Sequence, residues 1–445
     1  MNYIPHTDFE RREMLDTIGV NKLDDLFDAV PAKYRFPELN LPEPLTEMEA
    51  LWELQSLADA NADMGHYACF LGAGAYNHFI PSLVDHVIRR GEFFTAYTPY
   101  QPEVSQGTLQ AIFEFQSMIG NLTGFEICTA SHYDGATALA EAALMAVSVT
   151  GRAKVVLSPA VHPHYRATLR TYTRFREDVR VVGDEDLQRR LEDVLALVDE
   201  ETACLCVANP NFFGQLEVLD GLAERVHAKG ALLVVAANPI SLGLFKPPAE
   251  YGADVAVGEG QPLGIPLSFG GPYLGFFATR REFMRRIPGR IVGQTVDKEG
   301  RRGYVLTLKT REQDIRREKA TSNICTNQGL MALAACVYLS ALGKRGLQQV
   351  AGLCYHKAHY AADRIDRLDG YRVWNDHPFF NEFVVECPLP VSEINDYLLN
   401  EHDMIGGYDL GKDYPHLQRH MLLCCTETNT REEIDELIEA LSELE

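Results

Sequence analysis

Short apolar runs alternate with amphipathic segments through most of the chain from about residue 68 onward. The apolar runs that predict strands lie at 154–159, 179–183, 202–210, 231–239 and 253–258. Helical periodicity separates several of them, as in residues 184–198 and 219–230. Strands that alternate with helices at this spacing indicate an α/β fold with a mostly parallel sheet and helices on both faces.

The two ends of the chain follow different patterns. Capping boxes from Thr7 to Glu10 and from Thr46 to Glu49 open two helices on either side of a proline-punctuated stretch. After a long helical region, the pattern strand, helix, strand, helix predicts a smaller α+β domain. We therefore expect an N-terminal helical arm, a large domain and a small C-terminal domain, over residues 1–67, 68–344 and 345–445. The arm either wraps a partner subunit or packs on its own domain.

The 445-residue chain has a formal net charge of −22, which argues against nucleic acid as a partner. The charge is uneven, because residues 280–319 contain thirteen Lys and Arg against six Asp and Glu. This basic segment either docks an acidic partner or is neutralised internally by Glu282, Glu312 and Glu318. No apolar run has the length of a membrane span and no signal peptide is evident, so we expect a cytoplasmic protein with free thiols.

Two short motifs indicate where chemistry belongs. Residues 134–137, Asp-Gly-Ala-Thr, precede a strongly helix-forming run, and the free N–H groups at a helix start hold anions such as phosphate. The alternative is an ordinary helix cap. The turn after the strand at 253–258 contains Glu259, Gln261 and Pro262, and a glycine-rich second strand follows. We expect a reactive side chain at such a turn, but none of these residues offers an amine.

Together these landmarks resemble the large domain of fold-type-I enzymes that use pyridoxal phosphate (PLP). The resemblance implies an Asp that pairs with the pyridine nitrogen at a strand end, and the matching residue here is Val235. It also implies a Lys that forms a Schiff base with PLP at the later turn, and the matching residue here is Pro262. The scaffold therefore persists, while two groups essential for the cofactor chemistry are missing.

Three stretches carry a more specific resemblance, residues 5–15, 93–124 and 311–328. They resemble the first (alpha) chains of two-chain glycine decarboxylases, the P-proteins of the glycine cleavage system, and the likeness extends along essentially the full chain. It implies a heteromeric oxidoreductase, assembled as α2β2, whose PLP is bound by subunit 2 (beta). Glycine loses CO2, and its aminomethyl group passes to the lipoyl arm of the H-protein. The basic segment then fits an acidic H-protein, with Arg301 and Arg302 as test positions.

The resemblance also implies that this chain contributes to a site shared with its partner. We expect Thr321 and Ser322 to contact the phosphate of the partner's PLP, with a helix cap as the alternative. We expect a polar-aromatic loop to line the glycine pocket or the lipoyl channel, with an interface plug as the alternative. The candidate residues of this loop are Tyr97, Thr98, Tyr100 and Gln101. No metal site is expected.

Other residues fit less well into this scheme. His162 and His164 fall where the family stacks an aromatic ring on PLP, and without that cofactor we expect them to be structural. Two rival functions stay open, a non-catalytic scaffold or regulatory relative of PLP enzymes, and a self-sufficient PLP enzyme whose lysine lies elsewhere. The nearby lysines are Lys154, Lys229 and Lys246, and each requires a different alignment.

Overall fold

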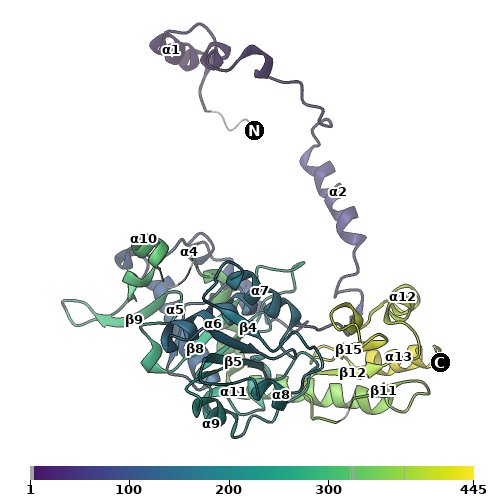
Figure 1. The fold of residues 1–445 in the computed structure, drawn as a ribbon. Coiled ribbons are helices and arrows are strands. Elements are labelled where there is room, and N and C mark those ends of the chain that lie inside the picture. The colour runs from purple at the N-terminus through teal and green to yellow at the C-terminus, as the bar shows by residue number, and fades with distance from the viewer. Residues whose placement is uncertain (1–4, 321, 323, 325, 375, 445) are drawn as a thin grey trace. The chain divides into compact units, whose positions relative to one another are not determined.

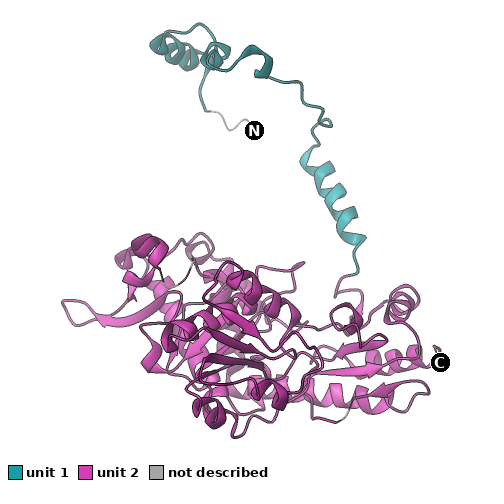
Figure 2. Cartoon of the chain, viewed as in Figure 1, with its two compact units in different colours: residues 1–62 teal, residues 63–445 magenta. Residues whose placement is uncertain are grey.

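The computed structural model describes residues 5–320, 322, 324, 326–374 and 376–444. The chain divides into two compact units, Met1–Ala62 and Asp63–Glu445 (Figures 1 and 2). The boundary predicted at residue 345 falls inside α11, the helix Gly329–Ile365. The three-part domain division therefore stays a prediction.

The first unit contains two helices, α1 (Asp8–Ile18) and α2 (Glu47–Asp59), and both begin with the predicted capping boxes. In α1, Thr7 Oγ1 accepts the Glu10 N–H at 3.3 Å, and the Glu10 carboxylate accepts the Thr7 N–H at 2.6 Å. Gly19 ends this helix with a φ of 87°, which favours glycine. None of the unit's described residues is buried. The first unit therefore has no hydrophobic core of its own.

A seven-stranded sheet forms the centre of the second unit, with the strand order β2-β8-β7-β6-β5-β3-β4. Its strands are β2 (Ile127–Cys128), β3 (Lys154–Leu157), β4 (Arg180–Val182), β5 (Thr202–Ala208), β6 (Leu232–Ala236), β7 (Val255–Glu259) and β8 (Gly275–Thr279). Neighbours from β4 to β7 pair in parallel, whereas β8 is antiparallel to β7 and β2. The mostly parallel sheet predicted from the sequence is confirmed.

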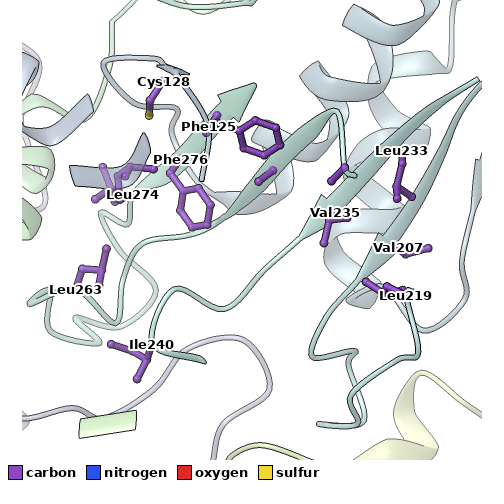
Figure 3. Close-up of a cluster of buried hydrophobic side chains, with 14 of the residues drawn as sticks. Phe125, Cys128, Val207, Leu219, Leu233, Val235, Ile240, Leu263, Leu274 and Phe276 are labelled. Atoms are coloured by element: carbon purple, nitrogen blue, oxygen red, sulfur yellow. The ribbon is translucent and has the colours of Figure 1, made fainter. Parts of the chain in front are cut away.

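Alternate side chains of the sheet enter two separate hydrophobic cores. On β6, Leu233 and Val235 belong to one core (Figure 3), and Val234 and Ala236 belong to the other. The first core also contains residues of α5 and α11, and the second contains residues of α6 and α7. The bounds of the three helices not yet given are α5 (Gln106–Thr123), α6 (Gly135–Thr150) and α7 (Pro163–Thr173). Because both faces are covered, the middle positions of the central strands are apolar, and polar residues such as Lys154, Thr202 and Glu259 stand at strand ends.

Two predicted helices are shorter than expected. Residues 184–198 form only α8 (Leu191–Leu195), and residues 219–230 form only α9 (Leu222–His227). Before α8, the Glu185 carboxylate accepts a backbone N–H from two residues earlier at 2.7 Å. Local bonds between acidic side chains and the backbone compete with helix formation.

The C-terminal part forms a four-stranded antiparallel sheet in the order β11-β12-β15-β14, as the predicted α+β pattern requires. Its elements are β11 (Arg372–Val373), β12 (Glu382–Glu386), α12 (Val391–Glu401), β14 (Tyr408–Asp409), β15 (His420–Cys424) and α13 (Arg431–Ser442). The remaining strands form two pairs, β1 (Ala68–Cys69) with β13 (Met404–Ile405) and β9 (Ile291–Val296) with β10 (Arg302–Thr307). Short helices complete the unit, α3 (Ser82–Ile88), α4 (Gly91–Phe94) and α10 (Gln313–Arg316).

Helix α11 is, among the described residues, the one helix long and apolar enough to cross a membrane by length and composition. Gly343 interrupts it with a φ of 58° and a ψ of −176°, so it consists of two helical pieces. Tyr338 in the first piece and Ala358 in the second are both buried in the hydrophobic cores. Such burial is typical of a core helix, and length and composition alone are weak evidence for a membrane span.

Candidate functional site

A small cavity lies at the carboxyl ends of the parallel strands, the edge where open α/β sheets bind their ligands. The ends of β5, β6 and β7 contribute Ala208, Ala236 and Glu259, and the following turns add Asn238 and Pro262. Its volume is about 70 Å³, against roughly 300–1,000 Å³ for typical ligand pockets. The space suits a few water molecules rather than a ring-sized cofactor.

The turn after β7 is closed by the amide of Gln261, which is 1 % exposed. The amide oxygen accepts the Tyr76 N–H at 2.9 Å, and the amide nitrogen donates to the carbonyl oxygens of Tyr76 at 2.9 Å and Ile265 at 2.7 Å. Pro262, the residue at the predicted Schiff-base position, lines the cavity, and no lysine is among the described residues around it. The amide of Gln261 is therefore fully hydrogen-bonded within the chain, at the turn where a reactive side chain was expected.

Val235, the residue at the predicted position of the pyridine-binding Asp, is fully buried on β6. Its side chain belongs to the apolar core with Leu233 and Leu263, and it is not among the cavity-lining residues (Figure 3). An ionised carboxylate at this position would lie in hydrocarbon without a partner, which is costly. The structure thus brings Pro262 to the cavity but directs Val235 into the core.

The carboxylate of Glu259 accepts three backbone N–H groups beside the cavity. Its Oε2 accepts the Gly135 N–H at the start of α6 at 3.0 Å. Its Oε1 accepts the N–H groups of Gln261 at 3.0 Å and Leu274 at 2.9 Å. Burial raises the pKa of Glu259 to about 7, although these three bonds favour the charged form and oppose the rise.

The motif at residues 134–137 forms a helix cap, the alternative to a phosphate cradle. The Asp134 carboxylate accepts the Thr137 N–H at 2.7 Å, and Thr137 Oγ1 accepts the Asp134 N–H at 3.3 Å. The same helix start also carries the bond to Glu259. Two carboxylates therefore share one helix N-terminus.

Two further titratable groups border the cavity. Glu382 on β12 accepts the Ala73 N–H at 2.6 Å and the Tyr76 hydroxyl at 2.7 Å, and burial raises its pKa to about 7. Burial lowers the pKa of His162 to about 4. In the neutral ring, Nε2 donates to the Ala73 carbonyl at 2.8 Å and Nδ1 accepts the His164 N–H at 3.0 Å. Both ring nitrogens are thus used inside the chain, in agreement with the expected structural role.

The polar-aromatic loop is fastened to Arg290, a buried arginine. Its guanidinium donates to Thr98 Oγ1 at 3.4 Å and to the Tyr100 hydroxyl at 3.1 Å. Arg290 is 5 % exposed and pairs with Glu312 at 3.3 Å. Lys309 Nζ lies 4.5 Å from the centre of the Tyr100 ring. Cations and hydrogen bonds therefore fix the position of this loop.

The other two candidate residues of the loop, Tyr97 and Gln101, are exposed. Tyr97 borders a groove of about 250 Å³ that the start of α11 completes. Thr326 and Asn327 line this groove and also a small cavity that includes Arg290. The loop and the residues Thr326 and Asn327 therefore lie side by side, and this groove shares no lining residue with the cavity at Pro262.

Ser322 is engaged within the chain. Its hydroxyl donates to Glu141 on α6 at 2.5 Å and accepts the Ile324 N–H at 3.0 Å. Burial raises the pKa of Glu141 to about 7, and the bond from Ser322 opposes this rise. Thr321 lies outside the described residues. The predicted contacts of Thr321 and Ser322 with a partner's phosphate stay predictions.

A basic groove lies beside α6, with a volume of about 830 Å³. Of its seven lining cations, six form no ion pair among the described residues, Arg152, Arg285, Arg286, Arg311, Arg316 and Lys319. Glu141 and Asp178 are the acidic residues in the lining, and Asp178 pairs with Arg176 at 2.6 Å. The groove therefore has an excess of positive charge.

The rest of the basic segment is partly neutralised inside the chain. Glu312 pairs with Arg290, as expected if acidic residues of the same chain neutralise the basic segment. In the β9–β10 hairpin, Arg301 pairs with Asp297 at 2.8 Å and Glu299 at 3.1 Å. Arg301 is thus paired within the chain, whereas Arg302, the other test position, and those six groove cations form no ion pair among the described residues.

Sequence reasoning missed the organising roles of Glu259 and Arg290. Glu259 ends an apolar strand and Arg290 precedes one, and a charged residue next to a buried run was the one available signal. The partners of Glu259 and Arg290 lie 124 and 190 residues away, at Gly135 and Tyr100. Periodicity does not report contacts over such separations.

The sheet, its two covering layers and the smaller α+β part define the fold of the fold-type-I PLP-dependent enzymes. Solved structures of two such proteins have this fold at low sequence identity. The sphingosine-1-phosphate lyase of Burkholderia pseudomallei has a TM-score of 0.65 and 16 % identity, covering 93 % of this chain and 94 % of its own. The alanine–glyoxylate aminotransferase of Nostoc sp. has a TM-score of 0.60 and 18 % identity, covering 86 % and 96 %.

The chain belongs to the glycine cleavage system P-protein family, whose sequence profile matches residues 1–441. It is 59 % identical to a probable glycine dehydrogenase (decarboxylating) subunit 1 of Thermomicrobium roseum, covering 100 % of this chain and 99 % of that one. The Bacillus cereus protein of the same description is 51 % identical with the same coverage. A crystal structure of an inhibitor-bound glycine decarboxylase (P-protein) has a TM-score of 0.92 and 47 % identity, covering 100 % of both chains. The predicted family is confirmed.

The raised pKa values of Glu141, Glu259 and Glu382 predict how stability depends on pH. Each carboxyl group keeps its proton to about pH 7 in the folded state but only to about pH 4.5 unfolded, so the folded state binds more protons between these values. The contribution of each to the free energy of unfolding is therefore lost as pH rises from 4.5 to 7, by up to about 3 kcal/mol. We expect Glu382→Gln to reduce the drop in urea midpoint between pH 5.5 and 7.5.

The control for this measurement is Glu299→Gln, because Glu299 is exposed on the β9–β10 hairpin. It is expected to leave the difference in midpoint unchanged. A Glu382→Gln protein with the full wild-type drop would contradict the assignment.

Proposed function

We propose that this chain is the alpha subunit of a two-chain glycine decarboxylase and that a homologous beta chain binds the PLP. The observation that carries the proposal is Pro262, which lines the cavity where a PLP enzyme of this fold needs a lysine. The relatives named as glycine dehydrogenase (decarboxylating) subunit 1 support an enzyme made of two different chains, since a first subunit implies a second.

The residues of this chain do not fit PLP. The cavity of about 70 Å³ is too small, no described residue around it offers an amine, and Glu259 already binds the helix start that would receive a phosphate. PLP, where it is bound, supplies an electron sink for the carbanion that decarboxylation leaves. We assign that role to the beta chain, and this chain contributes surfaces rather than the cofactor.

Two regions of this chain are available for a partner. The first unit exposes large apolar side chains and has no core, as the exposed fractions of 62 % for Trp52 and 72 % for Leu41 illustrate. The loop at Tyr97 and the described residues from Thr326 into the start of α11 form the second region. Both regions fit a subunit that completes the active site of its neighbour. We propose the α2β2 assembly that the resemblance to two-chain glycine decarboxylases implies.

The proposed reaction is the decarboxylation of glycine with a lipoyl disulfide as acceptor. The carboxylate leaves as CO2, and its bonding electron pair stays on the methylene carbon. That carbon bonds to one lipoyl sulfur of the H-protein, and the other sulfur takes a proton and becomes a thiol. The disulfide is thus reduced, so the assembled enzyme is an oxidoreductase. We propose that it acts in the cytoplasm and requires neither nucleic acid nor a membrane.

Of the two rival functions, the self-sufficient PLP enzyme has less support than the proposal. Three lysines were candidates for a self-sufficient enzyme, but Lys154 pairs with Asp199 at 2.7 Å and Lys229 with Glu200 at 2.8 Å. Lys246 also does not line the cavity. A non-catalytic scaffold explains the missing lysine equally well, and only the activity of the assembled chains separates it from the proposal.

The deciding experiment compares this chain alone, its partner alone and the mixture. We expect the lone chain to lack the visible absorbance of lysine-bound PLP, and the mixture to exchange the carboxyl group of glycine with bicarbonate. Stoichiometric PLP or exchange activity in the lone chain would contradict the proposal. If the partner were fully active by itself, the scaffold function would be favoured.

The basic groove predicts where the H-protein docks. We expect Arg285→Glu combined with Arg286→Glu to raise the KM for H-protein about tenfold at low salt and to change kcat little. The effect should shrink as salt screens the charges. Arg301→Glu is the matched control, because Arg301 is already neutralised by Asp297 and Glu299. Equal effects of both reversals would show that the groove has no special part in docking.

The exposed Tyr97 is predicted to act in the assembled enzyme. We expect Tyr97→Ala to lower kcat/KM for glycine about tenfold without changing the Tm, because Tyr97 is 78 % exposed and its removal costs little stability in this chain. Phe175→Ala is the control, since Phe175 is also an exposed aromatic residue but does not belong to the loop at Tyr97. If the two variants had the same kcat/KM, Tyr97 would be a passive interface residue.

A further inference from the structure

The start of helix α6 receives a carboxylate from a distant strand. Glu259 at the end of β7 accepts the Gly135 N–H at 3.0 Å, although the two residues are 124 positions apart. An ordinary helix cap does not need this contact, because Asp134 already caps α6 through the Thr137 N–H. The second carboxylate therefore has a different role from capping.

The three bonds of Glu259 connect three elements at the edge of the sheet. Gly135 begins α6, Gln261 lies in the turn after β7, and Leu274 leads into β8. These elements are packed closely, because a Cβ on Gly135 would overlap the hydroxyl of Tyr165 and lie 2.8 Å from the Glu259 nitrogen. A single acceptor group thus holds together the surroundings of the cavity.

A phosphate is the usual ligand of such a helix start, since backbone N–H groups and the helix dipole both favour an anion there. We propose that Glu259 is an internal anion that takes the place of a cofactor phosphate in this chain. It excludes phosphorylated ligands and keeps the strand-end region folded without them.

Electrostatics explains the exclusion. Above the pKa of Glu259, about 7, its carboxyl group is ionised, and a phosphate at the Gly135 N–H would lie within a few ångströms of the charges of both Glu259 and Asp134, which would repel it strongly. To admit the phosphate, Oε2 of Glu259 would have to give up the bond from the Gly135 N–H, and the displaced oxygen would need a new partner. The same carboxylate would exclude a phosphate whichever reaction the assembled enzyme performs.

The test is rescue of a Glu259→Ala protein by inorganic phosphate. Removal of the carboxylate leaves three N–H groups without their acceptor, so the full-length variant is expected to unfold at a lower temperature than the wild type. Phosphate should then raise its Tm saturably, by about 2 °C or more, relative to chloride at equal ionic strength. The wild-type Tm should show no saturable response to phosphate.

Glu382→Ala is the matched control. Glu382 is also a buried carboxylate at this cavity that accepts a backbone N–H, at Ala73, but it is not at a helix start. Its removal is expected to lower the Tm without creating a response to phosphate. If Glu259→Ala does not fold, Glu259→Ser replaces it, because a hydroxyl leaves one acceptor in the site.

Two results would overturn the inference. One is a phosphate response of the Glu259 variant no larger than that of Glu382→Ala. The other is saturable stabilisation of the wild-type chain by phosphate, which would mean that the helix start is open while Glu259 is present. The activity of the assembled enzyme enters neither result, so this inference and the proposed function fail independently.

Discussion

Burial of both faces of the seven-stranded sheet is the constraint on which the rest of the second unit depends. Because residues of β6 alternate between two apolar cores, the strands have no room for polar groups along their length. Polar side chains therefore emerge at the strand ends, where Glu259 meets the start of α6. Val235, at the position of the pyridine-binding Asp, packs into one of these cores as an apolar residue, so this fold does not require a carboxylate there.

The sequence was sufficient for features set by neighbouring residues. Capping boxes at Thr7 and Thr46 depend on contacts within three positions, and the apolar strands depend on burial on both faces. The helices predicted at 184–198 and 219–230 were too long. Before α8, the side chain of Glu185 bonds the backbone locally, which competes with helix formation. The contact of Glu259 with Gly135 could not be predicted. The two residues become neighbours only through the order of the strands in the sheet, which local sequence patterns do not specify.

The candidate site was predicted less completely than the fold. Pro262 lines the cavity, but Val235 points into the apolar core, because neighbouring positions on a strand face opposite ways. Tyr97 and Tyr100 lie in one loop, yet only Tyr100 bonds to Arg290, so the two have different surroundings. The predicted contacts with a partner's cofactor would need groups from a second chain, which this sequence does not specify.

The first unit, which lacks a core, has a consequence for how the protein behaves as its concentration changes. Apolar side chains such as Trp52 and Leu41 are not buried within this unit, so ordering it costs conformational entropy that its own packing does not offset. Its folded state is then linked to the amount of binding partner by mass action. Under the proposed assembly, dilution would release the first unit from its partner before it disturbed the sheet, and the two units would report different stabilities.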